Sequence, residues 1–264
     1  MKYWFFFFSI IILSCNNSST PDSAKVEPVA MSYLKYNILK TYPHDTASFT
    51  EGLFLHNDVL YEGTGLEGKT NIYQLDLQSG KVLKHYKEKD ASIFGEGISI
   101  VGNDLYQLTL DNKVVYVYDA KTLERKRQMV SPLKQGWGMT TDGKQLIAGD
   151  GSSKIYFLDP VALKIISSLN VSDNYGYVSN INELELVDGY IYANIWQTNY
   201  IVKINATTGK VEAKLDLAGI LDKAGIPHDP SKIDVLNGIA YNPANKHFYV
   251  TGKYWPAIIE INIQ

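Results

Sequence analysis

A short pattern returns five times along this chain, and the repetition constrains the possible fold more than any other feature. The copies read FTEGL, FGEGI, GWGM, INEL and LNGI, and their anchor residues lie 41 to 55 residues apart. A period near about 40–45 residues with about four strands per unit is typical of a β-propeller, whose blades surround a central axis. The sequence therefore predicts an all-β, five-bladed propeller. Its anchors, which would form a ring about the axis, are Glu51, Glu96, Trp137, Asn182 and Asn237.

A second repeat position supports the same register. It lies 14 to 16 residues after each anchor and is occupied by Gly65, Leu110, Gly151, Trp196 and Lys253. Alternating apolar and polar residues, with turn sequences such as VGND and TDGK, predict a hairpin between the two positions. A third strand follows in each unit, but the last unit runs out of chain. We expect residues 33–42 (YLKYNILKTY) to supply its missing outer strand and so close the ring.

The composition fits one soluble β domain and argues against several classes of function. The chain has 264 residues, of which 45% are hydrophobic, and its 19 Tyr suit half-buried strands. A formal net charge of −3 without a Lys/Arg-rich stripe argues against nucleic-acid binding. The five His are scattered and are expected at the surface or in loops. With Cys15 as the only Cys, we predict no metal site and no disulfide. We also expect a monomer, and the chemistry considered below requires no cofactor.

The N-terminus, MKYWFFFFSIIILSC, predicts a targeting segment. Its apolar run, residues 3–13, is short for a membrane span. It ends in ILSC, which resembles a bacterial lipobox, where the signal is removed before a Cys that becomes lipidated. The alternative is an ordinary signal peptide with an incidental Cys. We predict a lipoprotein signal over residues 1–14, a flexible tether over 15–32 and the propeller over 33–264. The protein would lie at the bacterial cell envelope, facing the periplasm or the exterior, with lipidated Cys15 as its membrane anchor.

Glu96 is the best candidate for acid–base chemistry. A carboxyl in an aromatic pocket has a raised pKa and could act as both base and acid near neutral pH. Its neighbours Gly95 and Gly97 would let the backbone approach a ligand closely. Trp137 and Trp196 both fall on ring positions, which is consistent with an aromatic box for a small organic group. The structural alternatives are a Glu that caps a strand or pairs with a Lys, and Trp side chains that pack between blades.

Lys253 stands where the other copies have Gly, Leu or Trp. An unpaired ammonium is costly near the centre of a protein, so we expect an acidic partner or an anionic transition state. A plain salt bridge to Glu51 or Glu96 is the structural alternative. Asn182 can donate and accept hydrogen bonds, which suits an amide ligand, although it could equally satisfy strand ends. Phe49, together with Glu51, is a further candidate for substrate binding.

In this order and spacing, FTEGL, FGEGI, QGWGMTTDGK, INELE, NIW and GKYW resemble the plant and bacterial glutaminyl-peptide cyclotransferases, also called glutamine cyclotransferases. The resemblance runs from about Leu34 to Ile263. It implies a metal-independent five-bladed propeller that converts the N-terminal Gln of peptides or proteins to pyroglutamate and releases ammonia. It also implies roles for individual residues: acid and base for Glu96, pocket walls for Trp137 and Trp196, and polarising groups for Asn182 and Lys253.

Two positions depart from the family pattern. Glu51 stands where plant relatives usually have Gln, and Leu110 where they have another pocket Trp. The Leu leaves a roomier, less aromatic wall. The Glu puts a second carboxyl near Glu96, and two close carboxyls rarely both ionise. These departures bear on substrate preference and pH optimum more than on the type of reaction.

Ring closure requires a neutral α-amine, an oxyanion intermediate and a proton for the departing amide nitrogen. One carboxyl could move the proton, while preorganised donors stabilise the oxyanion. Two other classes stay open. One is a non-catalytic propeller lipoprotein that binds a ligand or protein. The other is a lactonase-like propeller with calcium held by acids and amides of the first ring, although Trp137 and Lys253 argue against a cation there.

Overall fold

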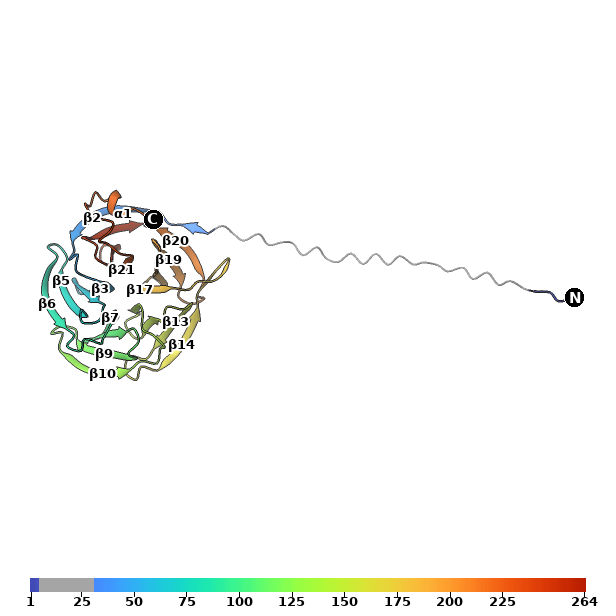
Figure 1. Ribbon diagram of the computed structural model, residues 1–264, viewed down its shortest axis with the longest axis horizontal. Helices are drawn as coiled ribbons and strands as arrows, with labels where there is room; N and C mark the ends of the chain where they lie inside the picture. Colours follow the sequence, from blue (N-terminus) through green and yellow to red (C-terminus); the bar gives the residue numbers. More distant parts are fainter. Residues whose placement is uncertain (5–30) are drawn as a thin grey trace.

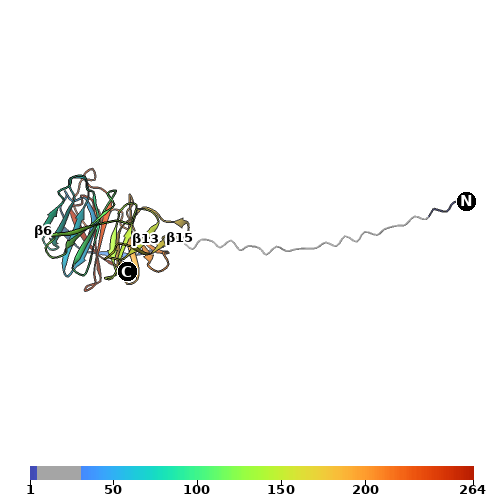
Figure 2. The same ribbon diagram turned by 90° about the horizontal axis from the view of Figure 1, so that it is seen from below.

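The computed structural model describes residues 1–4 and 31–264. Five sheets surround a common axis, as the face-on view shows (Figure 1), and they confirm the predicted five-bladed propeller. Turned by 90°, the same blades form a body with the strands running between its two faces (Figure 2). The only helix among the described residues is the short α1 (Ile220–Lys223).

Each blade is an antiparallel sheet whose strands follow one another from the axis outward. Blade 1 contains β3 (Thr50–His56), β4 (Val59–Thr64), β5 (Asn71–Asp76) and β6 (Lys81–Lys87). Blade 2 contains β7 (Gly95–Val101), β8 (Asp104–Thr109), β9 (Val114–Asp119) and β10 (Arg125–Val130). Blade 3 contains β11 (Met139–Thr141), β12 (Leu146–Gly149), β13 (Lys154–Leu158) and β14 (Ile165–Asn170). Blade 4 contains β17 (Ile181–Val187), β18 (Tyr190–Ile195), β19 (Tyr200–Asn205) and β20 (Val211–Asp216). Blade 5 contains β21 (Leu236–Asn242), β22 (His247–Gly252), β23 (Ala257–Ile263) and β2 (Tyr36–Pro43), and a small hairpin of β15 (Ser172–Asp173) and β16 (Gly176–Tyr177) precedes blade 4.

An N-terminal strand closes the last blade, as predicted. β2 pairs antiparallel with β23 and becomes the outer strand of blade 5. The predicted strand started at Tyr33, but Tyr33 lies in β1 (Ser32–Tyr33), which pairs in parallel with β20 of blade 4. Between β1 and β2, Leu34 packs against the core between blades 4 and 5, so the chain changes its pairing partner there. The start of the domain therefore joins both of the last two blades.

The core consists of five separate apolar clusters, one at each interface between neighbouring blades. At the interface of blades 1 and 2, for example, Ile72 and Ile98 are fully buried in one cluster. At the interface of blades 5 and 1, Leu53 packs in a cluster with Ala240. Each blade buries both of its faces only when it stands between two neighbours. The closed ring is therefore the unit that folds.

The residue that follows the anchor is Gly in four of the five repeats. A Cβ atom at Gly97 would lie 2.5 Å from the nitrogen of Met139, and one at Gly138 would lie 1.9 Å from the carbonyl oxygen of Asn182. A Cβ at Gly95 would likewise lie 2.5 Å from the Gln107 side chain. Close packing against protein atoms therefore accounts for both glycines without a ligand. Neighbouring strands pack too closely there for any side chain.

The fourth repeat has Glu183 at this position instead of Gly. Its fully buried carboxyl accepts the backbone N–H of Ile239, at 2.8 Å, and the more distant N–H of Leu53, at 3.5 Å. It thus ties the inner strands of blades 1, 4 and 5 together. Burial raises the pKa of Glu183 well above its ordinary value, and the nearby Glu185 adds to this rise.

Candidate active site

One cavity of about 360 Å³ lies at the end of the propeller where the inner strands begin. The residues that line it come from all five blades, because the repeat places corresponding positions around the same ring. The structure brings all seven predicted site residues to its wall. They are Phe49, Glu51, Glu96, Trp137, Asn182, Trp196 and Lys253.

Two positions in the strand repeat place five of these side chains at the cavity. Glu51, Glu96 and Asn182 are each the second residue of an inner strand, so they occupy equivalent places in β3, β7 and β17. Trp196 and Lys253 each come directly after the second strand of their blade. Both positions follow from hairpin register, which is why the sequence repeat could predict them.

Several cavity residues were not singled out from the sequence. Phe94, Gln135 and Val235 each lie two residues before an anchor, as Phe49 does. Because side chains in an extended segment alternate between faces, the residue two before an anchor points the same way as the anchor. This rule could have found all three. Gln197, Asp234 and Leu110 complete the wall, and neither repeat position predicts Asp234.

Aromatic rings form most of the apolar wall. Trp137 and Trp196 meet edge to face, with ring centroids 5.7 Å apart. Phe49 and Phe94 make a similar contact at 6.2 Å. Trp196 is 37% exposed and therefore lies at the mouth of the cavity. Such a wall offers a small organic group a dry, shaped environment.

Glu51 is the acidic partner of Lys253. The Lys253 Nζ lies 2.6 Å from Glu51 Oε1, and the two side chains are 6% and 2% exposed. The Lys253 ammonium also lies 4.1 Å from the centre of the Phe49 ring. Asn237, the fifth anchor, lies behind the pair and donates through Nδ2 to Glu51 Oε2 at 3.3 Å. Burial raises the pKa of Glu51, and the adjacent ammonium of Lys253 opposes that rise.

Glu96 is buried, and within residues 1–4 and 31–264 no group donates a hydrogen bond to its carboxyl. Burial raises the pKa of Glu96 well above the ordinary range. The charge of Glu51 raises it further, whereas the charge of Lys253 lowers it. The carboxyl is therefore free to exchange a proton with a group bound in the cavity.

Asn182 presents an unused hydrogen-bonding group. Its side-chain Oδ1 is buried and has no hydrogen-bond donor among the described residues. A buried amide oxygen without a donor is costly. A ligand that carries an N–H group would satisfy it, and the same amide can donate through Nδ2.

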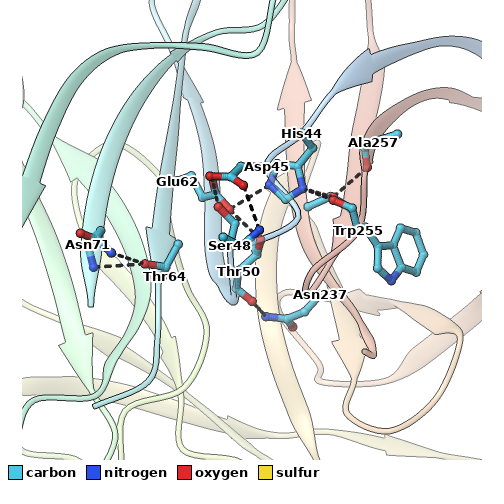
Figure 3. Close-up of polar contacts among 12 residues, drawn as sticks. His44, Asp45, Ser48, Thr50, Glu62, Thr64, Asn71, Asn237, Trp255 and Ala257 are labelled. Atoms are coloured by element: carbon cyan, nitrogen blue, oxygen red, sulfur yellow. Dashed lines mark hydrogen bonds and ion pairs between the residues drawn. The ribbon is translucent and has the colours of Figure 1, made fainter. Parts of the chain in front are cut away.

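One of the His residues expected at the surface or in loops is buried. His44 lies in a loop, but its side chain is only 1% exposed and its Nε2 lies 3.0 Å from Glu62 Oε1 (Figure 3). Isolated His residues in a sequence carry no signal of such pairing, because the partner comes from a different strand.

The described part of the chain contains no group of three or more His, Cys, Asp or Glu side chains placed to hold a metal ion. Among the same residues, no helix has the length and apolar character needed to cross a membrane. Cys15, the predicted lipidation site, lies outside the described residues.

Fold and cavity together define the class of protein: a five-bladed β-propeller with a buried carboxyl, amide and ammonium in an aromatic cavity at one end of its axis. Within that class, the chain belongs to the glutamine cyclotransferase family, whose model matches residues 9–263. The glutaminyl-peptide cyclotransferase of Arabidopsis thaliana is 35% identical over 228 residues, which cover 86% of this chain and 71% of the plant protein. The crystal structure of Myxococcus xanthus glutaminyl cyclase is similar with a TM-score of 0.80 at 30% identity, covering 89% of this chain and 99% of that one.

Proposed function

We propose that this protein is a glutaminyl-peptide cyclotransferase, which converts the N-terminal Gln of a peptide or protein to pyroglutamate and releases ammonia. The observation that carries the proposal is the buried, unpaired carboxyl of Glu96. It shares one aromatic cavity with Asn182 and the Lys253–Glu51 pair. Membership of the glutamine cyclotransferase family supports the same activity.

Glu96 moves the proton in this mechanism. A peptide α-amine has an ordinary pKa of about 7.7–8.0, so it arrives largely as an ammonium at neutral pH. Because burial raises the pKa of Glu96, proton transfer from the ammonium to its carboxylate costs less than transfer to an ordinary Glu would. The neutral amine attacks the side-chain amide carbon, which closes the five-membered ring. Glu96 next donates its proton to the departing nitrogen, which leaves as ammonia, and it takes the surplus proton from the ring nitrogen.

Lys253 and Asn182 stabilise the oxyanion that forms during attack. Both line the cavity as fixed, buried donors, and such preorganised donors are worth more in a dry site than in water. Trp137 and Trp196 hold the substrate side chain folded against its own amine. Because the reaction is intramolecular, this restriction of rotamers supplies a large part of the rate enhancement.

A direct assay separates this activity from the alternatives. Ammonia release is measured from a Gln-initiated dipeptide, with and without a chelator, and an Asn-initiated dipeptide serves as the matched substrate control. We expect chelator-resistant release from the Gln peptide alone. Binding without release would favour a ligand-binding propeller, and a chelator-sensitive hydrolase without ammonia release would favour the lactonase-like class.

Glu51 is expected to tune the titration of Glu96. In Glu51→Gln, the neighbouring negative charge disappears while the charge of Lys253 remains, so the pKa of Glu96 should fall. The base form then persists to lower pH, and the acidic limb of the kcat/KM profile should move to lower pH with activity retained. The native protein and the variant are assayed with the same substrate, so that the titration of the substrate amine affects both kcat/KM profiles equally. An unchanged limb would show that the two carboxyls do not couple, and complete loss of activity would mean that their roles are reversed.

Lipid anchoring at the cell envelope is part of the same proposal and rests on the ILSC sequence at residues 12–15. The native protein, expressed in a bacterium, should partition with membranes, and Cys15→Ala should release it to the soluble fraction. Stable anchoring requires more than one acyl chain, so mass spectrometry should find a multiply acylated N-terminal Cys. Finding unmodified Cys15 in the mature protein would rule out this anchor.

A further inference from the structure

A buried polar pair, His44–Glu62, lies outside the cavity and joins two of its walls. Glu62 is on β4, and His44 follows β2, the strand that closes the ring. His44 Nδ1 lies 2.7 Å from the carbonyl oxygen of Trp255, and its Nε2 lies 3.0 Å from Glu62 Oε1. Figure 3 shows the imidazole between these two groups. Since a carbonyl oxygen only accepts, the Nδ1 atom carries a proton, and a second proton lies between Nε2 and the carboxyl.

On one side, the pair holds the segment that presents Glu51. Glu62 Oε1 accepts a hydrogen bond from Thr50 Oγ1 at 2.7 Å, and Oε2 accepts one from Ser48 Oγ at 3.3 Å. Successive residues of a strand point to opposite faces. The contact to Thr50 therefore holds β3 from the face opposite to the one that carries Glu51.

On the other side, the pair holds the turn that presents Lys253. Besides the contact of the ring to Trp255, the backbone N–H of His44 donates to the carbonyl of Pro256 at 3.1 Å. The intervening residue Tyr254 has a φ of 63°, and its N–H donates to the carbonyl of Ser48 at 2.8 Å. A left-handed conformation is unfavourable for a residue with a side chain. The turn keeps this shape because its neighbours hold it.

We infer that His44 and Glu62 are positioning residues, which hold the Lys253–Glu51 pair in the geometry needed for oxyanion stabilisation. This inference rests on the proposed function. The two held segments meet at the 2.6 Å contact between Lys253 and Glu51, so release of either one displaces a group that faces the substrate. A misplacement of about 1 Å can cost on the order of 100-fold in rate. Substrate affinity should change little, because Trp137 and Trp196, which hold the substrate side chain, belong to blades 3 and 4.

The test uses two conservative variants that each keep one half of the connection. In His44→Asn, the amide nitrogen replaces Nδ1 and can still donate to Trp255, whereas contact with Glu62 is lost. In His44→Gln, the amide nitrogen approximates Nε2 and can still donate to Glu62, whereas contact with Trp255 is lost. Kinetics are measured with a Gln dipeptide well below the melting temperature of each variant. We expect kcat of His44→Gln to fall about 10- to 100-fold with KM within about threefold, and the loss in His44→Asn to be smaller.

A matched control separates positioning from stability. His247 forms a similar contact in the same blade, with its Nδ1 2.6 Å from Glu260 Oε1, at the opposite end of β22 from Lys253. His247→Gln should lower the melting temperature and leave kcat of the folded protein unchanged. Glu62→Gln, which weakens the contact that His44→Asn loses, should lower kcat in the same way as His44→Asn.

A double-mutant cycle with Lys253 tests directly whether His44 acts through Lys253. If His44 acts through Lys253, adding His44→Gln to Lys253→Met should reduce kcat by less than about threefold further. Losses that multiply, or native kcat in the folded His44 variants, would overturn the inference while leaving the proposed function intact. A native protein that releases no ammonia from the dipeptide would overturn both.

Discussion

Replacing Glu96 by Gln is expected to reduce kcat by roughly 10²- to 10⁴-fold, the range typical for removal of a general acid–base group. The change is nearly isosteric, and no hydrogen bond within the described structure depends on the carboxyl. It deletes the ability to take up a proton from the amine and return it to the departing nitrogen. Because the variant also removes a buried acid from an apolar site, we expect its free energy of unfolding at neutral pH to be equal or higher.

Binding and catalysis can be separated in this variant. The dissociation constant for a non-cyclising Gln analogue, such as a peptide with an N,N-dimethylated terminus whose tertiary amine cannot become a neutral ring amide, should stay within a few-fold of the native value. The loss should then appear in kcat. Near-native turnover by Glu96→Gln would show that another group carries the proton, and Glu51 would be the next candidate.

Replacing Lys253 by Met should reduce kcat/KM by roughly 10²- to 10³-fold, as expected for the loss of one oxyanion donor. It should also destabilise the fold, because removal of one partner leaves the buried Glu51 carboxyl without its ion pair, at a typical cost of about 3–5 kcal/mol. Loss of the ammonium should raise the pKa of Glu51 further, since the charge of Lys253 is what opposes the effect of burial. Denaturant unfolding and steady-state kinetics at the same pH measure the two effects.

The double variant Glu51→Gln/Lys253→Met separates these two roles. Removing both charges takes away the unpaired carboxyl, so most of the lost free energy of unfolding should return. Activity should not return, because the oxyanion still lacks its ammonium. Recovery of both properties would mean that Lys253 serves only as a structural partner of Glu51. Recovery of neither would mean that the loss of stability in Lys253→Met has a cause other than the unpaired Glu51 carboxyl.

The repeat in the sequence determined the number of blades, the closure of the ring and most of the residues at the cavity. This is possible because hairpin register is local: counting from an anchor through one turn places residues such as Trp196 and Lys253 at the same height in every blade. The alternation of side chains in extended segments extends the rule to Phe94 and Gln135. Both kinds of information lie within about twenty residues of an anchor.

Only the tertiary structure decided which groups at the ring pair with one another. Lys253 could have reached Glu51 or Glu96, and it contacts Glu51, a partner 202 residues away. In the same way, His44 reaches Glu62 only because the strand before it closes the ring. Position 97 must be Gly because a neighbouring blade packs against it, and the local sequence pattern does not describe that blade. The physical reason is that a repeat fixes the position of a residue along its own strand. The approach of two blades and the directions of their side chains set the distances across the axis, and those depend on the packing of the whole ring.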